Sequence, residues 1–247
     1  MADRRASVAI AGAGDYIGAA IARRFAREGY RVHAGRRSEG GLEALSAEIG
    51  AEGGHFRPHV LDVRSEDSVR AFLDAADDDA PLEACIFNVG ANVRFPLTET
   101  TERVFRKVWE MACFGGFLTG REAAERLLAH GRGSIFFTGA TASMRGAAGY
   151  AAFASAKAGL RALAQSMARE LGPRNIHVAH LVIDAGVDTA WVRERIAASR
   201  GAEAAAAIGK DVLMNPASIA ETYWQLHNQP RDAWTHELDL RPFAESW

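Results

Sequence analysis

The sequence predicts an α/β fold in which helices cover both faces of one doubly wound parallel sheet. The chain has 247 residues with no linker or internal repeat, so we take residues 1–247 as a single domain. Short apolar runs alternate with longer amphipathic runs along the whole chain. The first apolar run, residues 7–11, leads through a glycine-rich turn directly into a helical pattern. Together these three observations favour parallel strands joined by helical crossovers.

The individual elements follow in order from this alternation. The first five strand candidates are short and apolar, which is typical of parallel strands covered on both faces. We expect strands at residues 7–11, 31–35, 55–61, 84–88, 134–139, 176–183 and 234–240. We expect helices at residues 17–28, 42–49, 66–76, 101–129 and 150–171. Residues 187–215 have the least regular pattern, and a mobile helical lid over a substrate pocket is expected there.

Composition excludes several classes of protein. Hydrophobic residues make up 48% of the chain, which is enough for a sizeable core. The net charge of −2, with both signs interspersed, argues against a nucleic-acid or membrane surface. No apolar run approaches the ~18–20 residues that span a bilayer, and no signal-peptide pattern is present. Cys85 and Cys113 lie in apolar segments without metal-ligand spacing, so we expect reduced thiols, no metal site and a cytoplasmic protein.

The turn after the first strand carries glycines at positions 12, 14 and 18. Gly12, Gly14 and Gly18 allow a tight turn, close approach of a pyrophosphate, and close packing of helix on strand. The helix that begins at Ile17 would offer its free N–H groups to the phosphates. An ordinary strand–helix turn is the alternative, but the position after the first strand favours a Rossmann-like, NAD(P)-binding domain. Tyr16 stands in this loop where glycine is more common, and we include it in the predicted cofactor site.

Two adjacent arginines follow the second strand. A site for NAD would place a carboxylate there to bind the ribose hydroxyls, but no carboxylate precedes Glu39. Arg36 and Arg37 instead suit the 2′-phosphate of NADP, which a guanidinium binds with two hydrogen bonds. They could also be solvated surface arginines. We predict NADP.

With these segments placed, the chain resembles the short-chain dehydrogenase/reductase family over almost its whole length. Asp62 and Val63 resemble the pair that contacts the adenine, and Asn88-Val-Gly90-Ala resembles the family's stretch beside the cofactor. Thr189 stands where the family's threonine contacts the nicotinamide end. The resemblance implies that the cofactor is bound by Asp62, Val63, Asn88, Gly90 and Thr189. It also implies a homodimer or homotetramer, assembled through the helices expected at 101–129 and 150–171.

The family's catalytic residues are mostly missing. Its asparagine, serine and tyrosine fall at Ala112, Ala140 and Phe153, and only its lysine is present, as Lys157. The resemblance implies that Lys157 binds the nicotinamide ribose, although a chance surface lysine is the alternative. Loss of each polar donor of this kind typically costs on the order of 10²–10³-fold in rate. Ordinary alcohol–ketone chemistry by the standard arrangement is therefore not expected.

Tyr150 is the leading replacement for the missing acid. Seven residues of helix turn through ~700°, so Tyr150 and Lys157 project from one face, ~10 Å apart along the axis. This spacing resembles that of enoyl-acyl carrier protein reductases, which reduce C=C bonds and have an apolar residue at the position of Phe153. Tyr150 could instead begin the helix with its ring packed under the lid. Thr141 is a candidate second donor or a turn residue.

The sequence therefore predicts a reductase that transfers hydride from NADPH to a small, mostly apolar substrate. An activated C=C bond is slightly favoured over C=O. The alternative is a dinucleotide-binding regulatory protein without turnover. Carbonyl chemistry through Tyr150, Thr141 or Asp184 also stays open, although Asp184 could simply accept N–H groups of its own turn. His177 and His180 are expected to be structural.

Overall fold

The computed structural model describes residues 5–38, 40–209 and 211–245. Within these ranges, seven strands form one sheet in the order β3-β2-β1-β4-β5-β6-β7, and every neighbouring pair is parallel. The strands are β1 (Ser7–Ala11), β2 (Arg31–Arg36), β3 (His55–Val60), β4 (Leu82–Phe87), β5 (Gly133–Thr138), β6 (Ile176–Ile183) and β7 (Glu237–Leu240). The predicted single-domain α/β class with a doubly wound parallel sheet is confirmed.

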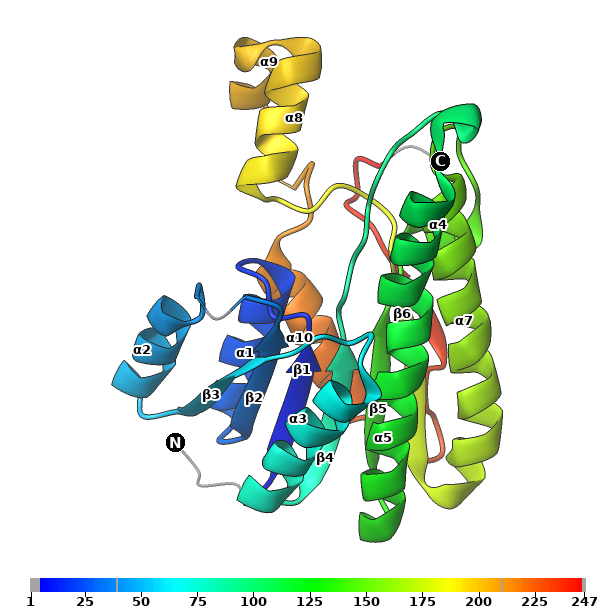
Figure 1. The fold of residues 1–247 in the computed structure, drawn as a ribbon. Helices are drawn as coiled ribbons and strands as arrows, with labels where there is room; N and C mark the ends of the chain where they lie inside the picture. The colour runs from blue at the N-terminus through cyan, green and yellow to red at the C-terminus, as the bar shows by residue number, and fades with distance from the viewer. Residues whose placement is uncertain (1–4, 39, 210, 246–247) are drawn as a thin grey trace.

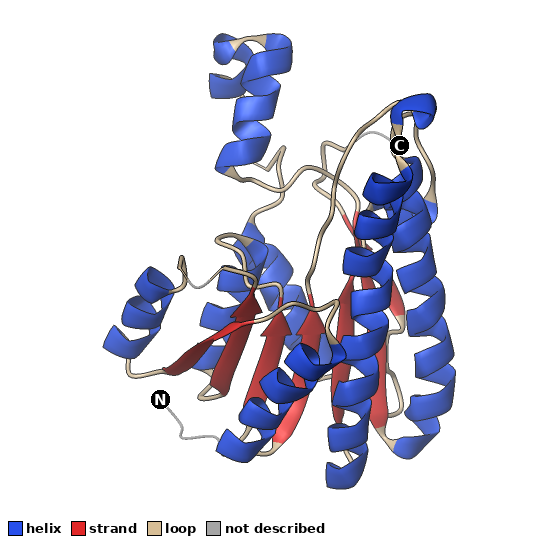
Figure 2. Ribbon diagram, viewed as in Figure 1, coloured by secondary structure: helices blue, strands red, loops and turns tan. Residues whose placement is uncertain are grey.

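Helices cover both faces of this sheet (Figures 1 and 2). One face packs against α1 (Ile17–Arg27), α2 (Glu43–Ala51) and α10 (Pro216–His227). The other packs against α3 (Glu66–Asp79), α5 (Gly115–His130) and α7 (Ala151–Leu171). The remaining elements are η1 (Leu97–Glu99), α4 (Glu102–Trp109), η2 (Glu110–Phe114), α6 (Thr141–Met144), η3 (Gly172–Arg174), α8 (Ala190–Arg200) and α9 (Ala202–Ala206). No helix in the described ranges is both long and apolar enough to cross a membrane.

The central strands are apolar because both of their faces are buried. In β1, Val8 and Ile10 point into the core under α1 and α10, whereas Ala9 and Ala11 point into the core under α3 and α5. The edge strand β3 is the exception, since most of its residues are exposed or half-buried. The neighbouring strands β2 and β4 hold β1 in the middle of the sheet, so the turn after β1 lies at the carboxyl edge of the sheet.

The long helix expected at 101–129 is interrupted. Residues 102–130 run as α4, the π-helical turn η2 and α5, and the last helix ends at Gly131 in the left-handed conformation. Ala112, at the position of the family's asparagine, lies in the π turn and is fully buried. π turns occur mostly as single insertions near functional sites.

Two further expectations need correction. The last strand begins at Glu237 rather than at residue 234. Residues 216–227 form helix α10, which the apolar pattern alone did not reveal. Its start is signalled by Asn215, whose side chain accepts from the N–H of Ala217, and by Pro216 in the first turn. An asparagine followed by proline could therefore have identified this helix.

The segment 187–215 contains helices α8 and α9, and its role as a mobile lid stays a prediction. In Figure 1 these two helices project beyond the carboxyl ends of the strands. The base of the segment is closed by a bridge between Val187 and Met214. The N–H of Asp188 donates to the carbonyl of Met214 at 2.8 Å, and the N–H of Met214 donates to the carbonyl of Gly186 at 2.9 Å. The chain thus leaves and rejoins the body of the domain at one point.

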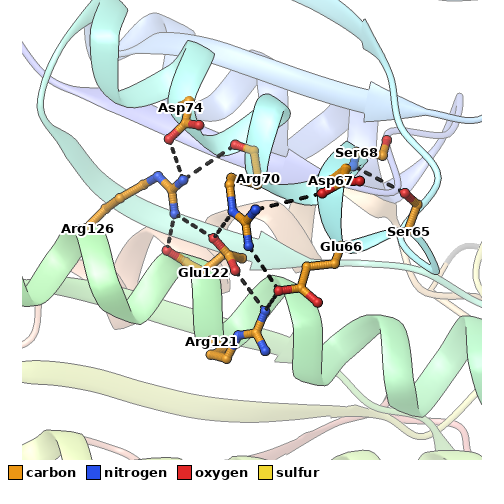
Figure 3. Close-up of polar contacts among 9 residues, drawn as sticks. All are labelled: Ser65, Glu66, Asp67, Ser68, Arg70, Asp74, Arg121, Glu122 and Arg126. Carbon is orange, nitrogen blue, oxygen red and sulfur yellow. Dashed lines mark hydrogen bonds and ion pairs between the residues drawn. The ribbon is translucent and has the colours of Figure 1, made fainter.

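Helices α3 and α5 are joined by the ionic network of Figure 3. At its centre lies Glu122, only 2% exposed. Its carboxylate accepts from Arg121 at 2.9 Å and from Arg126 at 3.3 Å, and Arg70 of α3 approaches to 3.7 Å. Because a buried carboxylate is costly unless it is paired, this network fixes α5 against α3. It lies away from the cavity described below and serves the scaffold.

Candidate active site

One cavity of about 1000 Å³ lies at the carboxyl ends of the strands. It spans the point between β1 and β4 where the strand order reverses, which is where open α/β sheets bind ligands. Asp184 is not among the residues that line this cavity, but the other residues proposed from the sequence for cofactor binding or catalysis all line it: Gly12, Gly14, Tyr16, Ile17, Gly18, Arg36, Arg37, Asp62, Val63, Asn88, Gly90, Thr141, Tyr150, Lys157 and Thr189.

The glycine turn has the geometry of a phosphate cradle. Gly12 has a φ of +94°, and a Cβ there would lie 2.8 Å from the backbone of Asn88. A Cβ on Gly18 would lie 2.7 Å from the Cα of Ala13. By contrast, a Cβ on Gly14 would meet nothing within 4 Å. The first and third glycines are therefore required for packing, whereas the second leaves open space beside the backbone.

The N-terminus of α1 offers unpaired donors to that space. Tyr16 occupies the N-cap position, and its side chain does not cap the helix. In the described ranges, the N–H groups of Tyr16, Ile17 and Gly18 make no hydrogen bond. Nor does the first turn of α1 carry an acidic residue. Free N–H groups at the positive end of a helix fit a pyrophosphate.

The two arginines at the end of β2 make only weak contacts with the described residues. Arg36 donates to the carbonyl of Gly41 at 3.3 Å and lies 3.4 Å from the exposed carboxylate of Asp15. Within the part of the chain that the structure describes, the guanidinium of Arg37 reaches only the sulfur of Met111, at 3.9 Å. Neither guanidinium forms a short ion pair with a described residue, so both retain donors for an anionic ligand. Glu39 lies outside the described residues.

Three further residues predicted to bind cofactor also have structural partners. Asp62 accepts from Arg64 at 2.6 Å, and this side-chain hydrogen bond lowers the pKa of Asp62. Val63 is buried against Gly115, where a Cβ would approach its side chain to 2.7 Å. Thr189 caps α8, because its hydroxyl accepts from the N–H of Val192 at 3.1 Å. These contacts fix the residues along the wall of the cavity.

A buried string of polar groups supports the floor of the site. Asn88 donates to the carbonyl of Gly12 at 3.0 Å, and its side-chain oxygen accepts from the hydroxyl of Thr138 at 3.0 Å. The hydroxyl of Tyr223, on α10, lies 2.6 Å from that of Thr138. Burial raises the pKa of Tyr223, so it remains a neutral donor. Neither Thr138 nor Tyr223 was predicted as a site residue, and Tyr223 was missed because α10 was not predicted.

Lys157 is buried, with only 3% of its surface exposed. Its ammonium donates to the carbonyl of Thr138 at 2.7 Å and to that of Val89 at 3.1 Å. Burial lowers the pKa of Lys157 to about 8. An ammonium has three donors, so one N–H remains for a ligand. The ring of Phe153, centred 6.0 Å from this nitrogen, forms an apolar wall where a phenol would otherwise stand.

Tyr150 occupies the N-cap position of α7 and so begins the helix, as the alternative to a catalytic role proposed. Its side chain makes no capping hydrogen bond. Its hydroxyl accepts from the guanidinium of Arg195, on α8, at 3.0 Å. The guanidinium of Arg94 lies over its ring at 5.8 Å. The hydroxyl therefore faces α8 at the cavity and keeps its own proton for an acceptor.

The other candidate acids differ in their surroundings. The hydroxyl of Thr141 makes no hydrogen bond to any described residue, and Thr141 begins α6. Asp184 is 2% exposed and lies 3.1 Å from Arg241 and 3.3 Å from Arg145. It is thus the counter-ion of two arginines, and its side chain accepts no backbone N–H in the described turn. This arrangement argues against Asp184 as the proton donor.

The histidines of β6 are structural, as expected. His177 stacks on Trp234 with ring centres 4.9 Å apart, and its Nε2 lies 2.8 Å from the carbonyl of Thr235. His180 is fully buried beside Glu237 at 3.0 Å, and burial lowers the pKa of His180 to about 4. Among the described residues, no three His, Cys, Asp or Glu side chains gather to hold a metal ion.

A family model described as short chain dehydrogenase matches residues 6–200. The chain belongs to the short-chain dehydrogenase family. This membership places it among NAD(P)-dependent oxidoreductases.

Solved members of the family share the whole fold. A short-chain dehydrogenase from Rhodopseudomonas palustris is 57% identical and has a TM-score of 0.82, covering 97% of this chain and 100% of its own. An alcohol dehydrogenase from the archaeon Thermococcus sibiricus, crystallised with 5-hydroxy-NADP, is 28% identical with a TM-score of 0.82, covering 98% of each chain. Among curated proteins, the 3-oxoacyl-acyl-carrier-protein reductase MabA of Mycobacterium tuberculosis is 31% identical over 188 residues, covering 76% of this chain and 71% of its own.

Proposed function

We propose that this short-chain dehydrogenase is an NADPH-dependent reductase of a small, mostly apolar substrate, with an activated C=C bond slightly favoured over C=O. The observation that carries the proposal is one cavity that joins an uncapped glycine turn to a buried Lys157 and to the hydroxyl of Tyr150. In this proposal Lys157 holds the nicotinamide ribose, and Tyr150 donates the proton. Thr141 would be a second donor.

Several features support NADP over NAD. Arg36 and Arg37 lie at the end of β2 with free donors, where a 2′-phosphate would approach. The archaeal relative was crystallised with an NADP derivative. In this assignment the N–H groups of Ile17 and Gly18 bind the pyrophosphate. Asp62 and Val63 border the adenine, while Asn88, Gly90 and Thr189 border the ring that reacts.

When bound, NADPH would supply the hydride. The chain supplies an acid and an apolar wall. Because Arg195 already donates to the Tyr150 oxygen, the phenol proton can point at a substrate oxygen that gains negative charge. Phe153 and Ala140 make the usual carbonyl position apolar. A conjugated substrate, whose enolate oxygen lies further from the reacting carbon, can reach Tyr150 instead. We favour reduction of C=C over C=O because the enolate oxygen of such a substrate can accept the proton of Tyr150.

The alternative is a dinucleotide-binding regulatory protein without turnover. It is favoured by the same three replacements, Ala112, Ala140 and Phe153, which leave the usual acid positions without donors.

The cytoplasmic assignment is supported by the free thiols of Cys85 and Cys113. A homodimer or homotetramer is supported by the partly exposed aromatic side chains of Trp109 and Phe117 along α4 and α5. Light scattering would give the number of chains.

The test is NADPH oxidation over matched enones, enoyl thioesters and ketones. We expect enone reduction to fall by about 10²–10³-fold in the Tyr150→Phe variant, the usual cost of a lost donor, while NADPH affinity stays unchanged. Full activity of Tyr150→Phe would exclude Tyr150 as the acid. Tight NADPH binding with no oxidation of any substrate would favour the regulatory alternative. In that case, ketone reduction gained by Ala140→Ser with Phe153→Tyr would show that only the acid is missing.

A further inference from the structure

Two arginines from separate segments contact Tyr150, and a third lines the same cavity. Arg94 lies in the loop after β4, Arg145 directly follows α6, and Arg195 belongs to α8. Arg195 donates to the Tyr150 hydroxyl at 3.0 Å, Arg94 lies over the Tyr150 ring, and Arg145 lines the cavity itself. These cations therefore flank the part of the cavity that holds the proposed acid.

Two of the three charges are not neutralised by any carboxylate in the described part of the chain. Arg145 is paired with Asp184 at 3.3 Å. Arg94 and Arg195 form no ion pair with any described carboxylate, and their guanidiniums contact aromatic rings instead. The contrast within α8 is direct, because the neighbouring Arg193 forms an ion pair with Asp188 at 2.6 Å. Glu194, beside Arg195 in the chain, is exposed and pairs with neither arginine.

The cofactor does not account for these two cations. Its phosphates would lie at the other end of the cavity, at the N-terminus of α1 and beside Arg36. Arg195 uses one of its five N–H donors on Tyr150, and its planar fork matches a carboxylate or phosphate. Arg195 is exposed, so an anion can reach its guanidinium from solvent. An oxyanion bound there would be held by charge-assisted hydrogen bonds.

We propose that the substrate carries an anionic group, a carboxylate or a phosphate, which Arg195 and Arg94 bind at the mouth of the cavity. This inference rests on the proposed function of the same site and narrows its substrate class. The body of the substrate is apolar and lies against Phe153, Ala142 and Val187, which line the cavity. The anionic group fixes the distance from the entrance to the reactive bond, and so places the enolate oxygen beside Tyr150.

The test uses unreactive probes, so that it does not depend on turnover. The NADPH-loaded protein is titrated with benzoate against methyl benzoate, and with phenyl phosphate against phenol, following the heat of binding. At least one anion should bind about tenfold tighter than its neutral partner, and the preferred anion identifies carboxylate or phosphate. Arg195→Gln and Arg94→Gln should each remove most of this preference without changing NADPH affinity.

The matched control is Arg200→Gln, which removes the same charge from the last turn of α8. It should keep the preference for anions. The inference is overturned if neither anion outcompetes its neutral partner, or if Arg200→Gln weakens anion binding as much as Arg195→Gln and Arg94→Gln do. Anion preference together with no NADPH oxidation would instead reject the proposed reaction and leave the anion site in place.

Discussion

At the scale of single residues, the side chain of Phe153 determines the chemical character of the site beside Lys157. It is 7% exposed, and its ring lies beside the Lys157 ammonium, so it replaces a proton donor with an apolar surface. Lys157 keeps its position without a phenol at 153, because two backbone carbonyls hold it. The cofactor half and the acid half of the site can therefore change independently. That separation makes an acid at Tyr150 compatible with an otherwise ordinary dinucleotide site.

At the same scale, Arg36 should decide between the two nicotinamide cofactors. We expect Arg36→Ala to weaken NADPH binding by about 10–100-fold and to leave NADH binding unchanged, because only NADPH carries the 2′-phosphate. Dissociation constants from fluorescence titration measure this. The control is Arg27→Ala, on the exposed face of α1, where the arginine pairs with Glu52. An unchanged ratio of the two affinities in Arg36→Ala would reject the NADP assignment.

At the scale of secondary-structure elements, helix α8 contacts residues at both ends of the cavity. The hydroxyl of Tyr16, in the glycine turn, accepts from the N–H of Ala190 at 3.0 Å. Ala190 is the first residue of α8, and Arg195 of the same helix contacts Tyr150. One helix thus touches both the phosphate turn and the proposed acid. With its base closed at Val187 and Met214, we propose that α8 and α9 move together as the substrate lid.

Removing the Tyr16 hydroxyl tests this element. We expect Tyr16→Phe to raise the hydrogen-exchange rate of the Ala190 amide by about fivefold or more, because the lost hydrogen bond is worth about 1 kcal/mol. Hydrogen–deuterium exchange with mass spectrometry measures it, and the amides of α10 serve as the internal reference. Equal exchange of α8 in Tyr16→Phe and wild type would show that this contact does not hold the lid.

Over the whole molecule, buried histidines tie stability to pH. His33 is fully buried in β2, stacks on His59 of β3, and lies 3.1 Å from Asp79. Burial lowers the pKa of both histidines, that of His59 to about 4, and likewise lowers that of His180 to about 4. These rings stay neutral in the folded chain at pH values where the unfolded chain takes up protons.

The contribution of these histidines to the free energy of unfolding should therefore be complete above pH ~6.5, the ordinary histidine pKa. It should decrease as the pH drops towards 4. Each such histidine contributes up to about 1.4 kcal/mol per pH unit within this window. Urea unfolding at fixed pH values measures the slope. His59→Gln should make the slope shallower, whereas His55→Gln, exposed in the same strand, should keep it. A pH-independent free energy between 6.5 and 4 would contradict this account.

The α/β class, the glycine turn and the positions of the cofactor-binding and acid candidates along the chain could all be read from the amino-acid sequence. This was possible because apolar periodicity, glycine spacing and motif order are local properties. The tertiary structure decided which groups meet. It placed Arg94 and Arg195 around Tyr150, Tyr223 of α10 beneath Asn88, and two arginines on Asp184. These partners lie tens of residues apart in the chain, and only the packing of the helices on the sheet brings their side chains within a few ångströms.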